Sequence, residues 1–398
     1  MKHFIYQLRR VKFSEFIQVW KLPIAMLFAF FYRLFHKDLW IVCEDKNEAR
    51  DNGYWFFKYV CENHPEQECV YAILNTSPDF EKVHKLGKTV PFGSLKHWIF
   101  YLASSKKISS QKAGNPNAAI FYFLEVYGFL RDKRIFLQHG ITKDDAKWLY
   151  YDVTKMSRFI CGAYPEYEYV RERFGYPKNN VVYTGFCRFD GLHDKMKENK
   201  IILIMPTWRA WIADEDRRLL QYEGTTVIPK TNYFKAWNDF LKDERLLLLT
   251  KRYGVKFIFF PHRNMQKYMN YFPKTQEHLE IAGGKKYDVQ ELMKSSSMMI
   301  TDYSSVFFDM IYMKKPIIFY QFDYERFREA QYAEGYFDYK SNPFGKSFGS
   351  KEDVFNELEK NIQKNFKVSK EFLHYHEKYF NLYDTNNCQR VFEVSQNL

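Results

Sequence analysis

Short apolar runs alternate with longer helical patterns along most of the chain. Most of the runs are continuous rather than alternating, which is typical of strands buried on both faces of a parallel sheet. The predicted strands are Leu39–Cys43, Val70–Leu74, Ile135–Leu137, Phe159–Cys161, Val181–Tyr183, Ile201–Met205, Lys256–Phe260, Met298–Thr301 and Pro316–Tyr320. Helical patterns lie between them, for example at Ala49–Glu62, Lys143–Met156 and Pro165–Phe174, and helices are also expected from Lys351 onward. The alternation predicts an α/β fold.

The strands form two series, separated by the polar, lysine-rich stretch His193–Lys200. A chain of 398 residues is long enough for two domains, each with its own core. We therefore predict two doubly wound, Rossmann-like domains, at residues 37–195 and 196–398, preceded by an amphipathic segment at residues 1–36. In such sheets, ligands bind in the crevice beyond the carboxyl ends of the strands, so we expect the functional site there.

The N-terminal segment has a pattern of its own. An apolar run from Leu22 to Phe31 lies between Lys21 and Arg33, with aromatic residues on both sides. The run is shorter than the roughly 20 apolar residues that span a bilayer. Its composition suits a helix that lies in the membrane interface. A buried first helix of the N-terminal domain fits the same residues equally well, and no cleavable signal peptide is expected.

Composition and charge narrow the function classes. Hydrophobic residues make up 46% of the chain and aromatic residues 20%, which is enough for packed cores and excludes a disordered protein. The net charge of +12 calls for an anionic partner: nucleic acid, an anionic membrane surface or a polyphosphate-like substrate. A nucleic-acid-binding protein is disfavoured, because the chain has no dense Lys/Arg cluster and no RRM, zinc-finger or KH signature.

Several cofactor classes are also disfavoured. The six cysteines include no CxxC pair, which indicates reduced thiols and no zinc site, so we expect no metal. No GxGxxG fingerprint occurs, so a nicotinamide or flavin enzyme has no support, and the residues around Gly345-Lys346-Ser347 do not complete a Walker A loop.

Four motifs that carry chemistry each follow a predicted strand. They are Gln138-His139-Gly140, Thr207-Trp208-Arg209, His262-Arg263-Asn264 and Thr301-Asp302-Tyr303-Ser304-Ser305. His139 titrates near neutrality and can accept a proton, and the glycine after it permits a sharp turn and a close approach. Arg209 offers a planar fork suited to phosphate oxygens. Taken alone, each of the first three motifs is more typical of a structural loop residue than of a ligand.

The fourth motif is the most informative. Val306, Phe307, Met310 and Ile311 predict a helix with an apolar face directly after the serines. Ser304 or Ser305 can cap this helix, and the free amides and dipole at a helix start can bind an anion such as a pyrophosphate. A plain serine cap without a ligand explains the same residues.

In this order, the four motifs resemble the CDP-glycerol glycerophosphotransferase family of teichoic-acid and capsule enzymes. Further segments with family-like sequence are Asp51-Asn52-Gly53-Tyr54, Gly185-Phe186-Cys187-Arg188-Phe189-Asp190, Asp309 with Lys315-Pro316, and Gly335-Tyr336-Phe337-Asp338. The resemblance runs from about Trp40 to about Gly345, and the combined pattern is specific although each piece is weak. The chain departs from the family at Gln138, where Trp is frequent, and at Cys187, where Pro is frequent.

The resemblance implies a glycosyltransferase-B-like fold and a peripheral attachment to the cytoplasmic face of a membrane. It implies transfer of glycerol phosphate from CDP-glycerol to an undecaprenyl-diphosphate-linked acceptor or a growing polymer, with release of CMP and without a cofactor. A ribitol-phosphate transferase that uses CDP-ribitol is a close alternative. A glycosyltransferase of the same fold with a nucleotide-sugar donor is a more distant one, because fold alone does not determine chemistry.

The resemblance also suggests roles for the motif residues. We expect His139 to be the base that deprotonates the acceptor hydroxyl, and His262 to stabilise the diphosphate or to protonate the leaving phosphate. The predicted donor- and phosphate-binding residues are Arg209, Arg263, Thr301, Asp302, Ser304, Ser305 and Asp309, the last of which either holds the ribose or faces the core. Further candidates are Gly140, Thr207, Arg188 and Asp190.

Overall fold

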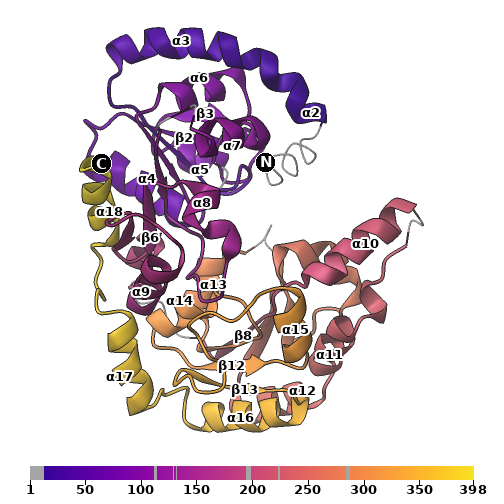
Figure 1. Cartoon of the computed structure of the whole chain (residues 1–398). Coiled ribbons are helices and arrows are strands. Elements are labelled where there is room, and N and C mark those ends of the chain that lie inside the picture. The colour runs from indigo at the N-terminus through magenta and orange to yellow at the C-terminus, as the bar shows by residue number, and fades with distance from the viewer. Residues whose placement is uncertain are drawn as a thin grey trace. The chain divides into compact units, whose positions relative to one another are not determined.

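The structure, a computed structural model, describes residues 13–111, 114–128, 130, 132–193, 199–222, 225–283 and 287–398. Residues 1–12 of the predicted N-terminal segment and residues 194–198 of the predicted linker lie outside this part. The chain divides into two compact units (Figure 1). The first contains the chain up to His139 together with residues 147–191 and 384–398, and the second contains residues 140–146 and 192–383.

Within the described ranges, the first unit is built on a seven-stranded parallel sheet with the strand order β3-β2-β1-β4-β5-β6-β7. The strands are β1 (Trp40–Cys43), β2 (Cys69–Ile73), β3 (Thr89–Pro91), β4 (Lys106–Ser109), β5 (Lys133–Phe136), β6 (Arg158–Cys161) and β7 (Val181–Tyr183). The helical segments are α2 (Phe13–Phe16), η1 (Ile17–Trp20), α3 (Lys21–Phe35), α4 (Asn52–Asn63), α5 (Phe80–His84), α6 (Leu95–Ala103), α7 (Ala118–Val126), η2 (Lys147–Leu149), α8 (Tyr151–Thr154), α9 (Tyr164–Arg173), η3 (Cys187–Leu192) and α18 (Asn387–Gln396).

The described part of the second unit contains a six-stranded parallel sheet with the order β10-β9-β8-β11-β12-β13. The strands are β8 (Ile201–Met205), β9 (Lys256–Phe259), β10 (Leu279–Ile281), β11 (Met298–Thr301), β12 (Ile317–Tyr320) and β13 (Gly345–Phe348). The helical segments are α10 (Ala210–Tyr222), η4 (Ile228–Lys230), α11 (Asn232–Leu241), α12 (Arg245–Tyr253), η5 (Arg263–Tyr271), α13 (Val289–Ser295), α14 (Phe307–Tyr312), α15 (Tyr324–Ala330), α16 (Lys351–Gln363) and α17 (Lys370–Tyr379).

The predicted α/β architecture with two parallel sheets is confirmed, and each predicted strand forms. The pattern missed β3, β4, β10 and β13. Strand β4 lies at the centre of its sheet although it begins with Lys106 and Lys107. Both lysines are buried, with their ammonium groups 4.7 Å from the ring centroid of Trp40 and 4.3 Å from that of Tyr101. Long apolar stems and aromatic partners let lysine occupy a central strand that a hydrophobic pattern excludes.

Two segments differ from the predicted organisation. The predicted helix Lys143–Met156 is wrong over its first part: only η2 and the single-turn helix α8 form, and residues 140–146 belong to the second unit. The C-terminal residues 384–398, which the predicted boundary assigns to the second domain, pack in the first unit, where α18 contacts α4. These residues belong to the first unit because two backbone N–H groups at the start of α18 donate hydrogen bonds to the carboxylate of Asp190, which caps the helix.

Helix α3 lies alongside α6, and one of its faces is covered (Figure 1). Ala25 and Ala29 are buried in the core of the first unit, with Leu22 and Tyr32 packed beside them at helical spacing. The other face exposes large apolar side chains, namely those of Ile24, Met26, Leu27, Phe28, Phe30, Phe31 and Leu34. With η1 included, the helix Ile17–Phe35 has 19 residues and is long and apolar enough to cross a membrane. The helix is therefore longer than the run that the sequence pattern singled out.

Candidate functional site

Arg209, after the carboxyl end of β8, lies in a buried cluster of charged side chains. Its guanidinium donates to both carboxylate oxygens of Asp323, at 2.7 and 2.9 Å, and its Nη1 lies 2.9 Å from Oδ2 of Asp302. The Arg209 side chain is 0% exposed, and its Cζ lies 4.9 Å from the ring centroids of Tyr233 and Tyr303. Protein carboxylates and rings surround the guanidinium, so Arg209 holds this framework together, and its predicted contact with phosphate stays a prediction.

The electrostatics of this cluster are set by its two carboxylates. Burial alone would lower the pKa of Arg209, but the charges of Asp302 and Asp323 outweigh burial and raise that pKa above its usual value. Arg209 therefore stays charged. The sequence analysis did not select Asp323. It lies three residues after β12, at the same edge of the sheet as the predicted motifs, and this position could have identified it.

Thr301 and Asp302 form a second layer of this framework. Oδ1 of Asp302 accepts the backbone N–H of Thr207 at 2.8 Å and that of Tyr303 at 2.6 Å. The hydroxyl of Thr301 donates to the carbonyl of Met205 at 2.6 Å. Both side chains are buried, so the bonds tie the end of β8 to the end of β11. Thr301, Asp302 and Thr207 all take part in bonds that hold the loops in place, and their predicted ligand roles stay predictions.

Ser304 and Ser305 follow this framework and are half-buried. Neither hydroxyl has a hydrogen-bond partner among the residues that the structure describes. The predicted serine cap does not form, because α14 begins after Val306 without a side-chain cap bond. Asp309 is 1% exposed within α14, so its core-facing alternative holds. The two serine hydroxyls are therefore the groups of this motif that a ligand can reach.

His262 follows β9 and is half-buried. Its Nδ1 accepts the backbone N–H of Asn264 at 3.2 Å, and its ring stacks on Trp208 with centroids 6.1 Å apart. Because Nδ1 is an acceptor, the neutral ring carries its proton on Nε2. The neighbouring Arg263 is exposed. The carboxyl end of β9 thus carries an imidazole and a guanidinium, two groups of the kind that bind phosphate oxygens.

In the first unit, His139 is exposed and follows the end of β5. The residue before it, Gln138, is buried. Its backbone φ is 59°, a left-handed conformation that residues other than glycine rarely adopt. The Gln138 amide donates to the carbonyl of Ile160 at 2.6 Å and to the Glu166 carboxylate at 3.0 Å. These bonds hold the strained turn from which His139 leaves the sheet.

Helix α4 supplies further bonds to this turn. Nδ2 of Asn52 donates to the carbonyls of Leu137 and Gln138, at 3.1 and 2.8 Å. Its Oδ1 accepts the backbone N–H of Arg188 at 3.1 Å. The Arg188 guanidinium pairs at 2.9 Å with Asp51, the residue that caps α4. Arg188, a further candidate, is thus a buried partner of the segment that supports His139.

Asp190, the other candidate of that loop, has a structural role as well. Its Oδ1 accepts the backbone N–H of Asn387 and its Oδ2 that of Cys388, both at 2.9 Å. Two backbone donors at the start of α18 are thereby satisfied. In this structure Asp190 is a helix cap.

Gly140 lies in the second unit, against one of the two serines. A Cβ atom on Gly140 would lie 2.6 Å from Oγ of Ser305, closer than nonbonded atoms approach, so glycine fits where a larger residue does not. Sequence reasoning also missed a buried ion pair that follows, between Asp144 and Arg328 at 2.6 Å. No motif signals this pair, because its members stand 184 positions apart.

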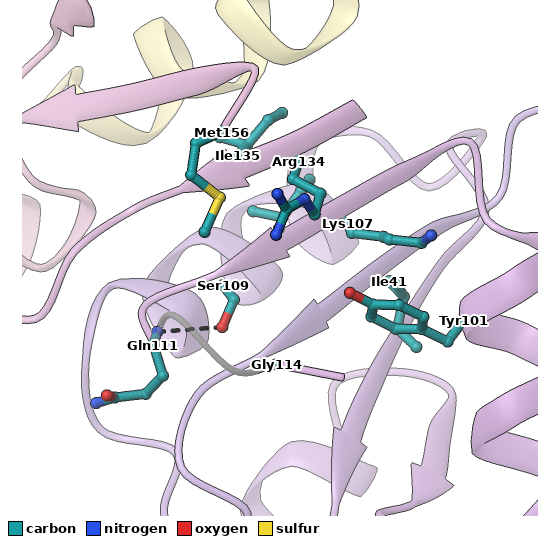
Figure 2. A pocket seen from close by; sticks show the side chains of 10 residues that line it. Ile41, Tyr101, Lys107, Ser109, Gln111, Gly114, Arg134, Ile135 and Met156 are labelled. Carbon is teal, nitrogen blue, oxygen red and sulfur yellow. Dashed lines mark hydrogen bonds between the residues drawn. The ribbon is translucent and has the colours of Figure 1, made fainter. Parts of the chain in front are cut away.

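A small cavity in the first unit is lined in part by residues of the paired strands β4 and β5 (Figure 2). Its volume of about 20 Å³ has room for about one water molecule. Its charged lining residues are already paired, Arg134 with Glu125 at 2.8 Å and Lys107 with Asp132. None of the sequence candidates lines this cavity, so we assign it no substrate.

The described residues contain no group of three or more His, Cys, Asp or Glu side chains that could hold a metal ion. The six cysteines are free thiols.

Comparisons with known proteins point to one family. The family model described as CDP-glycerol:poly(glycerophosphate) glycerophosphotransferase matches residues 25–395. The minor teichoic acid biosynthesis protein GgaB of Bacillus subtilis (strain 168) is 32% identical, over 90% of this chain and 39% of its own length. The teichoic acid ribitol-phosphate polymerase TarL of Staphylococcus aureus is 26% identical, over 55% of this chain and 38% of its own length. The chain thus aligns with less than half of either relative.

Among solved structures, the wall teichoic acid polymerase TagF matches with a TM-score of 0.63 over 99% of both chains, at 16% sequence identity. At this identity the likeness shows the fold, which agrees with two parallel-sheet α/β units.

Proposed function

The chain belongs to the CDP-glycerol:poly(glycerophosphate) glycerophosphotransferase family, and on that premise we propose that it transfers glycerol phosphate from CDP-glycerol to a lipid-linked acceptor or a growing teichoic-acid or capsule-type polymer, releasing CMP. The observation that carries this proposal is the pair Ser304 and Ser305. Their hydroxyls are accessible at a strand end, while the residues just before them are locked into a buried framework. Hydroxyl donors that follow a backbone held in this way suit a diphosphate.

In the proposed reaction, the oxygen of an acceptor hydroxyl attacks the phosphorus that bears the glycerol. A new P–O bond forms there, the P–O bond to CMP breaks, and the hydroxyl proton passes to His139. The Nε2–H of His262 donates to the phosphate oxygens of the leaving CMP. Ser304, Ser305 and Arg263 bind the diphosphate, and no cofactor takes part. In phosphoryl transfer, positioning and charge stabilisation of this kind supply most of the catalysis.

A ribitol-phosphate transferase is the second candidate, because TarL, a ribitol-phosphate polymerase by name, aligns with 55% of the chain. Glycerol and ribitol differ in the polyol beyond the phosphate, whereas the residues proposed here contact the diphosphate. The donor is therefore decided by a direct comparison of CDP-glycerol with CDP-ribitol.

We further propose that the enzyme has a glycosyltransferase-B-like fold and sits at the cytoplasmic face of the cell membrane as a peripheral protein. The support is helix α3, whose packed face rests on the first unit while Phe28, Phe31 and Leu34 are more than half exposed on the other face. An exposed apolar helix face partitions into the membrane interface. The net charge of +12 adds attraction to an anionic leaflet. An undecaprenyl-diphosphate-linked acceptor would be available at that surface.

The test is CMP release by the purified full chain, incubated separately with CDP-glycerol and CDP-ribitol. The acceptor is a lipid-linked analogue with a terminal glycerol phosphate. We expect CMP only when acceptor is present. His139→Ala and His262→Ala should each lower kcat by about 10²- to 10⁴-fold, the usual cost of losing a general acid or base.

His374→Ala is the matched control, because His374 is an exposed histidine of α17 outside the proposed site. It should leave the rate unchanged. If a folded wild-type chain releases no CMP from either donor, the proposed function is wrong. Wild-type turnover in one histidine variant would remove that residue from the mechanism.

A further inference from the structure

The residues that directly follow His139 are held by the second unit. Gly140 lies against Ser305, as described above. Gly335 packs so closely on the next part of the segment that a Cβ atom there would lie 2.2 Å from the carbonyl oxygen of Lys143. The backbone N–H of Asp145 donates to the carbonyl of Ala333 at 3.2 Å. Residues 140–146 are thus bound along their length to the unit that carries the two serines.

A buried ion cluster holds the middle of this segment. Asp144 accepts from Arg328 at 2.6 Å and from the adjacent Lys143, and the three side chains are 11% exposed or less. The aromatic ring of Tyr339 covers both cations, 5.4 Å from Lys143 Nζ and 5.5 Å from Arg328 Cζ. Burial lowers the pKa of Lys143. Burial also opposes the charged form of Arg328, but the charge of Asp144 and the hydrogen bonds to Asp144 and Tyr324 together outweigh it and raise the pKa of Arg328. Removing Asp144 would take the shared carboxylate from two buried cations, whereas removing Arg328 would leave Asp144 paired with Lys143 alone.

Helix α15 connects this cluster to the framework of the serine loop. Asp323, the residue that precedes the helix, pairs with Arg209, and Arg209 pairs with Asp302 just before the serines. Arg328 lies one turn further along the same helix and pairs with Asp144. One short, rigid element therefore holds both the serine loop and the chain next to His139.

We infer that Asp144 and Arg328 are positioning residues for His139. Their ion pair fixes residues 140–146 on α15, and the peptide bond to Gly140 passes that constraint to the histidine. On the other side, the bonds of Gln138 and Asn52 anchor the chain in the first unit. This inference rests on the proposed role of His139 as the base. A base that is misplaced by about 1 Å loses up to about 100-fold in rate.

The kinetic test compares Arg328→Gln, Asp144→Asn and Arg328→Lys with Arg326→Gln. Arg326 is an exposed arginine of the same helix and serves as the control. We expect Arg328→Gln and Asp144→Asn to lower kcat for acceptor-dependent CMP release by about 10- to 100-fold, with the KM for the CDP-alcohol unchanged. Arg328→Lys should restore part of the rate, and Arg326→Gln should behave as wild type.

Two further measurements separate positioning from a general loss of structure. In the double variant His139→Ala/Arg328→Gln, the rate should equal that of His139→Ala alone, because the second residue acts through the first. Hydrogen exchange of Arg328→Gln should be faster in residues 140–146 and unchanged in β11. Multiplicative rate losses, or unchanged exchange in the segment, would overturn the inference. If the wild-type chain releases no CMP, the proposed function fails first, and the exchange measurement still decides whether Arg328 holds the segment.

Discussion

The two units hold their strand-end loops with different chemistry. In the first unit, neutral amides do so: Asn52 and Gln138 bond backbone carbonyls and a carboxylate around the turn that presents His139. In the second unit, the loop before Ser304 is held by a fully buried arginine between two aspartates, Arg209 with Asp302 and Asp323. Both arrangements stand at the carboxyl edge of a parallel sheet, so the fold does not dictate which one is used.

The difference in chemistry determines how much stability each unit loses when a mutation removes one partner of these bonds. A buried amide that loses its partner costs about 1–3 kcal/mol. A buried ion pair that loses one partner costs about 3–5 kcal/mol, because a bare charge stays in a low dielectric. The cluster of Arg209, Asp302 and Asp323 pairs its one cation with two carboxylates, so it has no net positive charge to attract a phosphate. A donor diphosphate must therefore be met by the exposed groups around it, and the cluster serves to fix their positions.

The largest expected effect comes from replacing Arg209, which lies between Asp302 and Asp323. Arg209→Met keeps an apolar stem but leaves Asp302 and Asp323 buried without their cation, so we expect the second unit to lose about 3–5 kcal/mol of stability. Hydrogen exchange of β8, β11 and β12 measures this loss within one unit. Arg217→Met is the matched control, because the Arg217 side chain is 76% exposed on α10 and should change stability by less than about 0.5 kcal/mol. Equal protection in both variants would show that the cluster is not what holds these loops.

A smaller effect is expected for the amide network of the first unit. Asn52→Ala leaves two buried carbonyls and one backbone N–H without their partner, which should cost about 1–3 kcal/mol. It should also lower kcat, because the turn before His139 loses a support. Asn63→Ala, at the exposed end of the same helix, is the control. The measurement is hydrogen exchange of β5 with CMP release. If Asn52→Ala destabilises the first unit as much as Arg209→Met destabilises the second, the amide network and the ion pairs do not differ in their contribution to stability.

The strand pattern in the sequence predicted the architecture well, and its failures have a physical cause. Continuous apolar runs report burial on both faces, so they found strands such as β8 and β11. Strand β4 escaped because Lys106 and Lys107 are buried through their stems and aromatic partners. Residues 140–146 escaped because the helical pattern of Lys143–Met156 is local, whereas the partners Arg328 and Gly335 are distant in sequence. Tertiary contacts overrode the local propensity.

The sequence placed the candidate site residues at the carboxyl ends of strands, but it did not indicate which of them are buried and paired. Motifs at strand ends combine residues that hold a loop with residues that the loop exposes, and the sequence does not distinguish the two. Arg209, Asp302 and Thr301 belong to the first kind because they are buried and paired. Ser304 and Ser305 belong to the second kind. Burial separates the kinds, and it depends on how the neighbouring strands pack.

The smallest expected effect is one that the two units should share. Each contains a buried histidine away from its strand-end loops: His97 in α6, whose pKa burial lowers to about 3, and His376 in α17, whose pKa burial lowers to about 4. An unfolded histidine titrates near 6.5. Between these values the unfolded chain binds the proton and the folded chain does not. The stability is therefore complete above about pH 6.5 and falls as the pH drops toward the folded pKa, by about 1.4 kcal/mol per histidine at pH 5.5.

Lowering the pH therefore tests whether the two units differ in stability only through the residues at their strand ends. Hydrogen exchange at pH 7.5 and pH 5.5, corrected for the intrinsic exchange rate, should show a similar loss of protection in both units of the wild-type chain. His97→Gln should remove about 1.4 kcal/mol of that loss from the first unit alone, and His376→Gln should do the same in the second. His374→Gln, an exposed neighbour on α17, should change neither. If the second unit loses much more protection than the first at pH 5.5, its carboxylates add to the acid sensitivity. The two units would then differ in their response to pH as well as in their response to mutation. A loss that persists in both buried-histidine variants would assign the acid sensitivity to other groups.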